Sequence, residues 1–266
     1  MKRVFLAVTF AAFAHSAFAG LTYKVDSAST GFRDSMTSGV AEVEGKNFRF
    51  NVTKGDAAIF PDSSFVISQN GGRTLVVADP GTKTYYELSL DQISGGAGAI
   101  LQQMGGMVKF DVVNPKVSVR DLGAGEKIEG YATTHKNMDT SYDMSLDVMG
   151  QKMTIGMSMS TESWVTDQIP LDFASFLQTA DLHTGFDAID KLIAAQTKGL
   201  SGFPLKQVAS IHIVQNGATM DMKTTTTISG IEKKSFPASE FAIPDGFQKT
   251  ENPIDKMMKA MGGMKQ

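Results

Sequence analysis

The chain has 266 residues, no cysteine, and 25 basic against 28 acidic residues, which gives a formal net charge of −3. It contains no basic stripe, which argues against nucleic acid and anionic membrane as binding partners. Without cysteine it can form no disulfide and carry no lipid on a cysteine. Its stability must therefore come from an ordinary hydrophobic core, for which the length is sufficient.

The first nineteen residues have the pattern of a cleavable secretory signal. Two basic residues, Lys2 and Arg3, precede a short apolar run, and an A-x-A sequence ends at Ala19. The run is shorter than the roughly 20 apolar residues that cross a bilayer. A buried N-terminal helix is the alternative, but it does not explain the placement of the charges. We expect a periplasmic or secreted protein, with residues 20–266 forming one free, monomeric domain.

Alternation of apolar and polar residues, typical of half-buried strands, dominates the mature chain. The predicted strands are residues 21–25, 40–44, 48–52, 65–69, 74–78, 83–88, 108–113, 116–121, 127–135, 144–148, 153–159, 207–215 and 219–229. Asn70-Gly71 and Asn216-Gly217 suit tight hairpin turns.

Three segments have helical character instead. Residues 90–107 predict a loose, glycine-weakened flap, residues 171–198 a second flap with an apolar stripe, and residues 253–264 a methionine-rich tail helix. The predicted strands do not alternate with helices in βαβ units, which predicts a mainly β (α+β) fold. We expect a curved antiparallel sheet or half-open β-barrel of about eleven strands, with helices covering its concave face.

Short motifs between residues 39 and 86 carry a family resemblance. They are Gly39-Val40 at a strand start, Phe48-Arg49-Phe50 in the next strand, the Asn70-Gly71-Gly72 turn, and Val77-Ala78-Asp79-Pro80 followed by Lys83. In these motifs the chain resembles the periplasmic lipoprotein-carrier superfamily, the LolA/LolB-like fold. The resemblance implies a half-open barrel that holds acyl chains in an apolar cavity under capping helices.

Three further motifs are similar to those of an uncharacterised exported branch of that superfamily. They are Lys83-Thr84-Tyr85, Gly202-Phe203-Pro204-Leu205 and the closing run from Phe241 to Phe247. The chain departs from the carrier in starting with a strand, and Gly45-Lys46 stands where the carrier has its lid-locking arginine. The resemblance therefore implies a cavity without implying the carrier's lock-and-release step.

The candidate ligand-binding residues lie on the apolar faces of two predicted hairpins. We expect the cavity for a hydrophobic ligand to be lined by Phe48, Phe50, Val52, Met144, Leu146, Met153, Ile155, Met157 and Met159. Met220 and Met222 repeat the same two-residue spacing. Flexible thioether side chains adapt to varied apolar ligands. A closed methionine-rich core produces the same alternation, so both interpretations remain open.

Catalytic and metal-binding patterns are weak. The mature chain has three histidines, His135, His183 and His212, whose spacing matches no metal-ligand motif, and the G-x-S-x-G nucleophile motif is absent. His212 lies between two isoleucines and is expected to face solvent. The tail methionines could bind copper(I), but docking on the barrel explains them better. We expect no enzyme activity, no cofactor and no metal.

Two functions follow from these patterns. The first is an exported carrier that holds a hydrophobic ligand, an acyl chain or the lipid of a lipoprotein, with transient contact to a membrane. The second is a structural or interaction module with a closed core that recognises another envelope protein. An enzyme acting on esters or glycosides is the remaining alternative.

Overall fold

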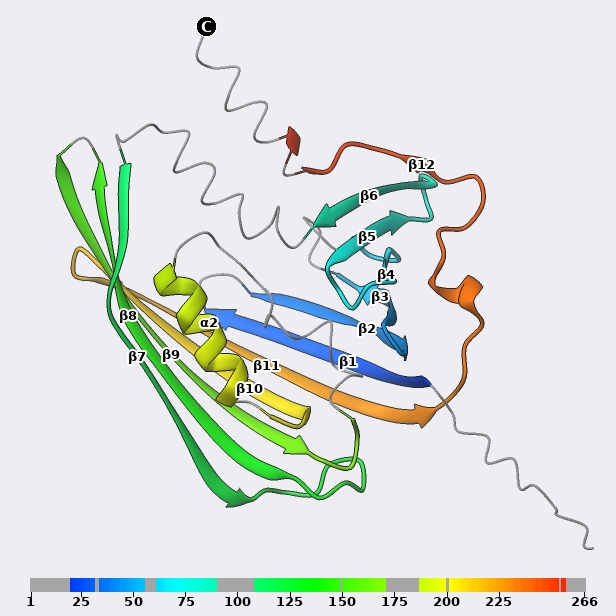
Figure 1. Cartoon of the computed structure of the whole chain (residues 1–266), viewed down its shortest axis with the longest axis horizontal. Helices are drawn as coiled ribbons and strands as arrows, with labels where there is room; N and C mark the ends of the chain where they lie inside the picture. The colour runs from blue at the N-terminus through cyan, green and yellow to red at the C-terminus, as the bar shows by residue number, and fades with distance from the viewer. Residues whose placement is uncertain are drawn as a thin grey trace, which may run out of the picture.

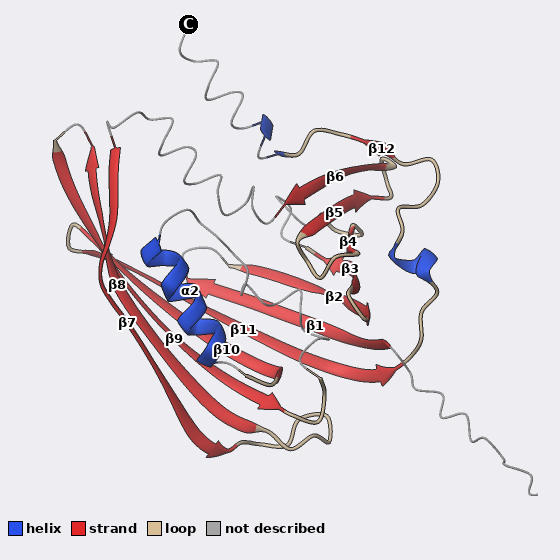
Figure 2. Cartoon of the chain, viewed as in Figure 1, coloured by secondary structure: helices blue, strands red, loops and turns tan. Residues whose placement is uncertain are grey.

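One long sheet forms the body of the protein (Figure 1, Figure 2). The computed structural model describes residues 20–31, 34–55, 61–89, 108–148, 150–170, 187–199, 201–253 and 255–256. Within these residues the sheet has twelve strands in the order β12-β6-β5-β4-β3-β2-β1-β11-β10-β9-β8-β7.

The strands are β1 (Gly20–Gly31), β2 (Ser35–Glu44), β3 (Asn47–Lys54), β4 (Phe65–Ser68), β5 (Thr74–Asp79), β6 (Thr84–Ser89), β7 (Val108–Ala124), β8 (Thr134–Val148), β9 (Gln151–Thr166), β10 (Phe203–Gln215), β11 (Ala218–Lys233) and β12 (Gln248–Lys249). The helices are α2 (Asp187–Gly199) and the 3₁₀ turn η2 (Ala238–Phe241). Strand β12 pairs with β6 in parallel, whereas the other pairs are antiparallel.

The hairpin turns predicted from glycine positions are confirmed. Asn216 and Gly217 both have positive φ, 51° and 79°, between β10 and β11. Gly71 and Gly72 have φ of 71° and 89° between β4 and β5, where the Asn70 side chain accepts a hydrogen bond from the Thr74 amide at 3.0 Å. Residues with positive φ match the twist of the strands that such turns connect.

The predicted mainly β class is confirmed, with three differences in detail. Residues 108–124 form one strand where two were expected, because a bulge at Asn114, with φ of 56°, absorbs the break in alternation without ending the pairing. Residues 127–133 contribute only the isolated bridge between Ile128 and Tyr131, so the predicted strand there is wrong. The sheet has twelve strands and an open edge at β7, and it is mixed because of β12.

The main hydrophobic core lies where the sheet curls over at one end. Its buried members come from β1, β2, β3, β4, β5, β6, β10 and β11, with Ile169 added from the β9–β10 connection. Phe203 is fully buried and meets Tyr23 edge to face, with ring centroids 5.4 Å apart. Strands far apart in the sheet order share this one cluster, so the curl of the sheet closes the core. We call this region the closed core.

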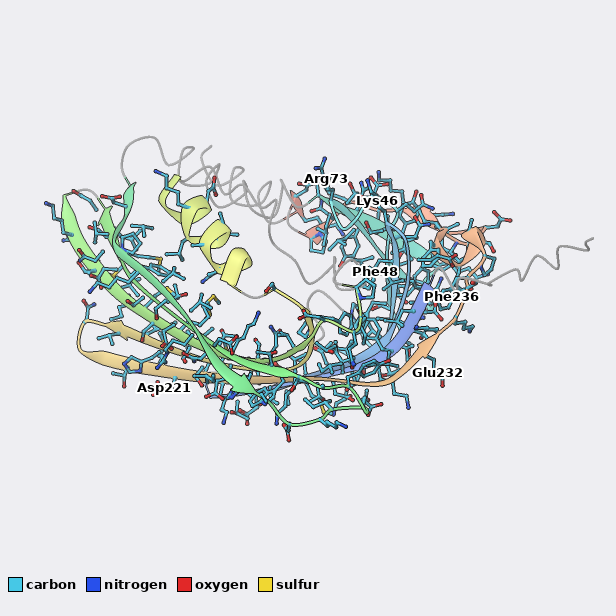
Figure 3. All side chains as sticks on the ribbon, turned by 60° about the horizontal axis from the view of Figure 1, so that its bottom comes forward. Lys46, Phe48, Arg73, Asp221, Glu232 and Phe236 are labelled. Atoms are coloured by element: carbon cyan, nitrogen blue, oxygen red, sulfur yellow. The ribbon has the colours of Figure 1, made fainter. Side chains whose placement is uncertain are left out.

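Helix α2 lies over the concave side of the sheet (Figure 1, Figure 3). It lies within the predicted helical region 171–198, whose residues 171–186 are outside the described ranges. The flap predicted at 90–107 and most of the tail helix predicted at 253–264 also lie outside them. Cover by several helices therefore stays a prediction. Among the described residues, no helix has the length and hydrophobicity needed to cross a bilayer.

Candidate functional site: a methionine-rich face on the concave side

Apolar side chains on the concave side of β8–β11 line up across the strands. One row joins Tyr142, Met157, Ile213 and Met220, and the next joins Thr140, Met159, Ile211 and Met222. Leu146 pairs with Met153, and Met144 pairs with Ile155. Residues directly opposite on antiparallel strands have Cβ atoms about 4.5–5.5 Å apart, so these side chains form one continuous surface. We call it the inner methionine face; it comprises Tyr142, Met144, Leu146, Met153, Ile155, Met157, Met159, Ile211, Ile213, Met220 and Met222.

Every residue of the inner methionine face is half-buried; its neighbours along β9, β10 and β11 are mostly exposed, whereas those along β8 are half-buried as well. On β10, for example, half-buried Ile211 and Ile213 alternate with exposed Ser210, His212 and Val214. Burial raises the pKa of the Tyr142 hydroxyl above its ordinary value, as expected for a phenol beside apolar groups. The face thus combines an apolar surface with partial access from outside.

A belt of hydroxyl groups separates the inner methionine face from the closed core. Ser27 Oγ and Thr226 Oγ1 lie 3.0 Å apart, and Ser29 Oγ and Thr224 Oγ1 lie 2.8 Å apart. On β9, Thr161 and Ser163 are buried on the same side of the sheet. The two pairs of hydroxyl groups are hydrogen-bonded to each other, and Ser163 Oγ accepts a hydrogen bond from the Gln207 side chain at 3.2 Å, which makes the burial of these groups tolerable. The two apolar regions are therefore separate surfaces on one sheet.

Helix α2 contacts β8 at Thr140, beside Met159 of the inner methionine face. The Gln196 side chain donates a hydrogen bond to Thr140 Oγ1 at 3.1 Å, and Leu192 is buried. After the helix, the Lys136 ammonium donates to the carbonyl oxygen of Ser201 at 3.0 Å and to its hydroxyl at 2.9 Å. Both anchors lie on the concave side of β8, so the helix is held above the face by polar contacts at two points.

The nine residues predicted to line a ligand divide into two groups. Phe48 and Val52 are 3% exposed, and Phe50 packs against the closed core. The other six, from Met144 to Met159, lie on the inner methionine face. The prediction joined two hairpins that share a side of the sheet, but the hydroxyl belt and the curl of β3–β6 keep them apart. Alternation alone cannot indicate this division.

Tyr142 of the face was missed from the sequence, and so were the two isoleucines Ile211 and Ile213. Their alternation with His212 predicts their orientation, but only the pairing of β10 with β9 and β11 brings them between the methionines. Among the described residues, no group of three or more acidic or histidine side chains could hold a metal. His135 lies 3.1 Å from Glu162 and stacks on Trp164, and His183 is outside the described ranges.

A family model, described as a domain of unknown function and labelled DUF4412, matches residues 41–247. The chain belongs to the DUF4412 family. The matched range runs from within β2 through β11, so this family's domain includes the inner methionine face and the closed core apart from its β1 residues. A search of curated proteins finds no match to the chain.

Several solved structures are similar to this DUF4412 chain. A LolA superfamily protein from Nitrosomonas europaea is 12% identical over 85% of this chain and 91% of that one, with a TM-score of 0.31. A DUF1329 family protein from Desulfovibrio piger is 8% identical over the same shares, with a TM-score of 0.30. PNGF-II is 12% identical over 91% of this chain and 33% of that one, with a TM-score of 0.33.

A member of the LolA superfamily, the group that the sequence motifs resemble, is among these matches, and the family shown for this chain is one of unknown function. At TM-scores near 0.3 the likeness carries no information about a ligand. The function has to be inferred from the side chains of this chain.

Proposed function

We propose that this DUF4412 chain is an exported binding protein that holds a hydrophobic ligand, an acyl chain of a lipid or lipoprotein, against the inner methionine face. The observation that supports this most strongly is the half-burial of that face beside a core that is already closed. A stable fold does not require a second, separate apolar surface rich in methionine. A ligand that completes its burial explains why the sequence keeps it.

The area of the face is sufficient for useful affinity. Each buried methylene contributes about 0.8 kcal/mol, so about ten of them supply roughly 8 kcal/mol before the costs of ordering. That corresponds to a dissociation constant near micromolar. The row from β8 to β11 crosses three strand gaps of about 4.8 Å, a length suited to an extended chain. No specific polar contact is needed, so we expect binding that is tolerant of chain length.

The mature protein in this proposal is residues 20–266, released to the periplasm or outside the cell after cleavage following Ala19. A monomer that carries its ligand between membranes would contact each membrane only transiently. Neither a cofactor nor a metal has a role in this proposal.

The proposal is tested by titrating the mature protein with a fluorescent fatty acid. Two adjacent residues on β10 provide a matched pair of variants, because Ile213 faces the inner methionine face and Val214, which is 37% exposed, faces the opposite side. We expect Ile213→Lys to weaken binding by at least tenfold and Val214→Lys to leave it unchanged. Equal affinities of the two variants, or no uptake by the unmodified protein, would refute the proposal.

One observation favours the alternative of an interaction module. Strand β7 forms an edge of the sheet, and its Val119 and Leu122 are exposed apolar side chains. An envelope protein that bound there would bury the apolar surface that these two side chains expose to solvent. Cross-linking in intact cells separates the two functions: one stoichiometric protein partner, together with no lipid in native mass spectrometry, would support the module.

A further inference from the structure

Five side chains from five neighbouring strands form a single row on the convex side of the sheet. In strand order they are Lys116 of β7, Ser141 of β8, Ser158 of β9, His212 of β10 and Asp221 of β11. Figure 3 shows Asp221 on the side of the sheet away from α2. All five line one groove with a volume of about 850 Å³.

Three neighbours in this row, Ser158, His212 and Asp221, stand in the serine–histidine–aspartate order of an acyl-transfer site. His212 Nδ1 lies 2.6 Å from Asp221 Oδ1. Since a carboxylate can only accept, the proton of a neutral imidazole lies on Nδ1, and Nε2 carries the lone pair. Among the described residues, no hydrogen bond to that Nε2 is formed. Ser158 is the residue directly opposite His212 on the other neighbouring strand, within side-chain reach.

We propose that Ser158, His212 and Asp221 form a second, catalytic site that hydrolyses small polar esters. Serine, histidine and aspartate in this order provide a nucleophile, a base and a group that orients the base. Such triads occur on unrelated folds and are recognised by geometry, so the absence of a G-x-S-x-G motif does not count against one. The site lies on the opposite side of the sheet from the inner methionine face, and its activity is independent of ligand binding there.

The reaction proceeds in two balanced steps. The Ser158 Oγ forms a bond to the ester carbonyl carbon while His212 Nε2 takes the hydroxyl proton. The ester C–O bond then breaks, and the leaving alkoxide takes that proton from the imidazolium. In the second step a water oxygen attacks the acyl-serine and gives its proton to His212, which returns it to Ser158 as the carboxylic acid departs.

The other two residues of the row lie on the side of Ser158 away from His212, near the ester oxygen that becomes negatively charged in the reaction. Ser141 is directly opposite Ser158, and Lys116 is directly opposite Ser141. A hydroxyl donor and an ammonium on this side can stabilise the negative oxygen of the tetrahedral intermediate. The adjacent row adds further hydroxyl groups to the groove, from Ser118, Ser160 and Ser210. A floor of this kind suits a small substrate with polar groups better than a long acyl chain.

We expect turnover to be slow, because water reaches the site. The His212 side chain is 47% exposed and the Asp221 side chain 75% exposed, so the carboxylate supports the imidazolium less strongly than a buried one does. An acceleration of about 10²-fold over the uncatalysed reaction matches the lower range for a single positioned acid–base group.

Two measurements on the mature protein test the site: hydrolysis of p-nitrophenyl acetate, and covalent labelling by a fluorophosphonate located by peptide mass spectrometry. We expect the label on Ser158, and loss of both signals in Ser158→Ala and His212→Ala. Ser145→Ala is the matched control, because it removes a hydroxyl from β8 on the same side of the sheet as Ser141 but outside the groove, and both signals should persist.

Asp221 is a positioning residue, and its variants separate positioning from substrate binding. Asp221→Asn should lower kcat about tenfold with KM unchanged, and Asp221→Glu should restore part of kcat. Ser158, His212 and Asp221 are exposed, so folding is not expected to change. Labelling that persists in Ser158→Ala, labelling lost in Ser145→Ala, or no labelling of the unmodified protein would each refute the site. None of these results would affect fatty-acid binding on the opposite side.

Discussion

The closed core and the inner methionine face are built from the same alternation on the same side of one sheet, yet only one is sealed. In the closed core, the sheet curls until residues of β5 and β6 join the cluster that contains Phe203 and Leu205 of β10. At the other end, β7–β11 extend past that curl, and α2 is the one described helix above them (Figure 1). Closure thus depends on the path of the sheet as well as on which residues face inward.

The difference in chemistry follows the difference in geometry. The closed core uses aromatic and branched side chains with defined shapes, such as Tyr23 and Phe203. The inner methionine face uses flexible thioethers, which tolerate an irregular or changing neighbour. Rigid packing suits a surface whose partner is always present, and pliable packing suits one whose partner is a ligand.

The largest expected effect is a loss of stability when the closed core is truncated. Phe203→Ala should lower the free energy of unfolding by about 3–5 kcal/mol, because it opens a cavity in a fully buried site. Met222→Ala on the half-buried inner methionine face should cost about 1 kcal/mol. Urea denaturation of both variants measures the contrast. Similar losses would show that the two regions are packed equally well.

A pair of glycine substitutions compares the closed core with the convex side of β9 by adding a methyl group at each. A Cβ on Gly39 of β2 would lie 2.5 Å from the Phe50 ring and 2.5 Å from the Asn51 carbonyl oxygen, so Gly39→Ala should cost about 1–3 kcal/mol. A Cβ on Gly156 of β9 would meet nothing closer than 3.5 Å. Gly156→Ala should therefore be neutral or stabilising by up to about 1 kcal/mol, since glycine is costly within a strand. The midpoint of thermal unfolding reports both changes.

The hydroxyl belt between the two regions should behave as a coupled set. Thr226→Val leaves the Ser27 hydroxyl without its partner and should cost about 1 kcal/mol. The double variant with Ser27→Ala removes both hydroxyls and should be nearly as stable as the original protein. A double-mutant cycle by chemical denaturation measures this coupling. Additive losses from the two changes would show that the hydrogen bond contributes nothing.

The smallest expected effect concerns Glu42, on the convex side of the closed region. Burial, and then the nearby Glu240, raise the pKa of Glu42, against the opposing effects of Arg49 and Lys234. Its Oε2 is buried and has no hydrogen-bond partner among the described residues. The folded protein therefore holds the proton to higher pH than the unfolded chain, and stability falls as pH rises from the ordinary glutamate value through the raised one.

Glu42→Gln removes this loss. The variant should be more stable than the original protein at neutral pH, by less than about 1 kcal/mol because solvent screens a half-buried group. The difference should shrink on acidification toward the ordinary glutamate pKa. Thermal unfolding across pH measures it, with Glu232→Gln as the same charge change on an exposed side chain. A constant difference at every pH would contradict the linkage.

Local features of the sequence determined much of this protein. Alternation predicted the β8–β9 hairpin and the orientation of its methionines, and Asn-Gly pairs predicted the turns at residues 70–72 and 216–217. These features succeed because side-chain direction in a strand and positive φ in a turn depend on near neighbours in the chain. The bulge at Asn114 and the bridge at 128–131 depend on partners elsewhere, and there the predictions were wrong.

Only the tertiary structure decided which residues on the concave side are fully buried and which side chains lie next to one another on neighbouring strands. Phe48 and Met157 have the same local pattern, but the curl of β1–β6 buries the first and the hydroxyl belt leaves the second on a separate, half-buried face. In the same way, Ser158 and His212 are unremarkable in sequence and become neighbours through the register of β9 with β10. Pairing between strands sets such contacts, because sequence alternation defines a side of the sheet but not the neighbour on the next strand.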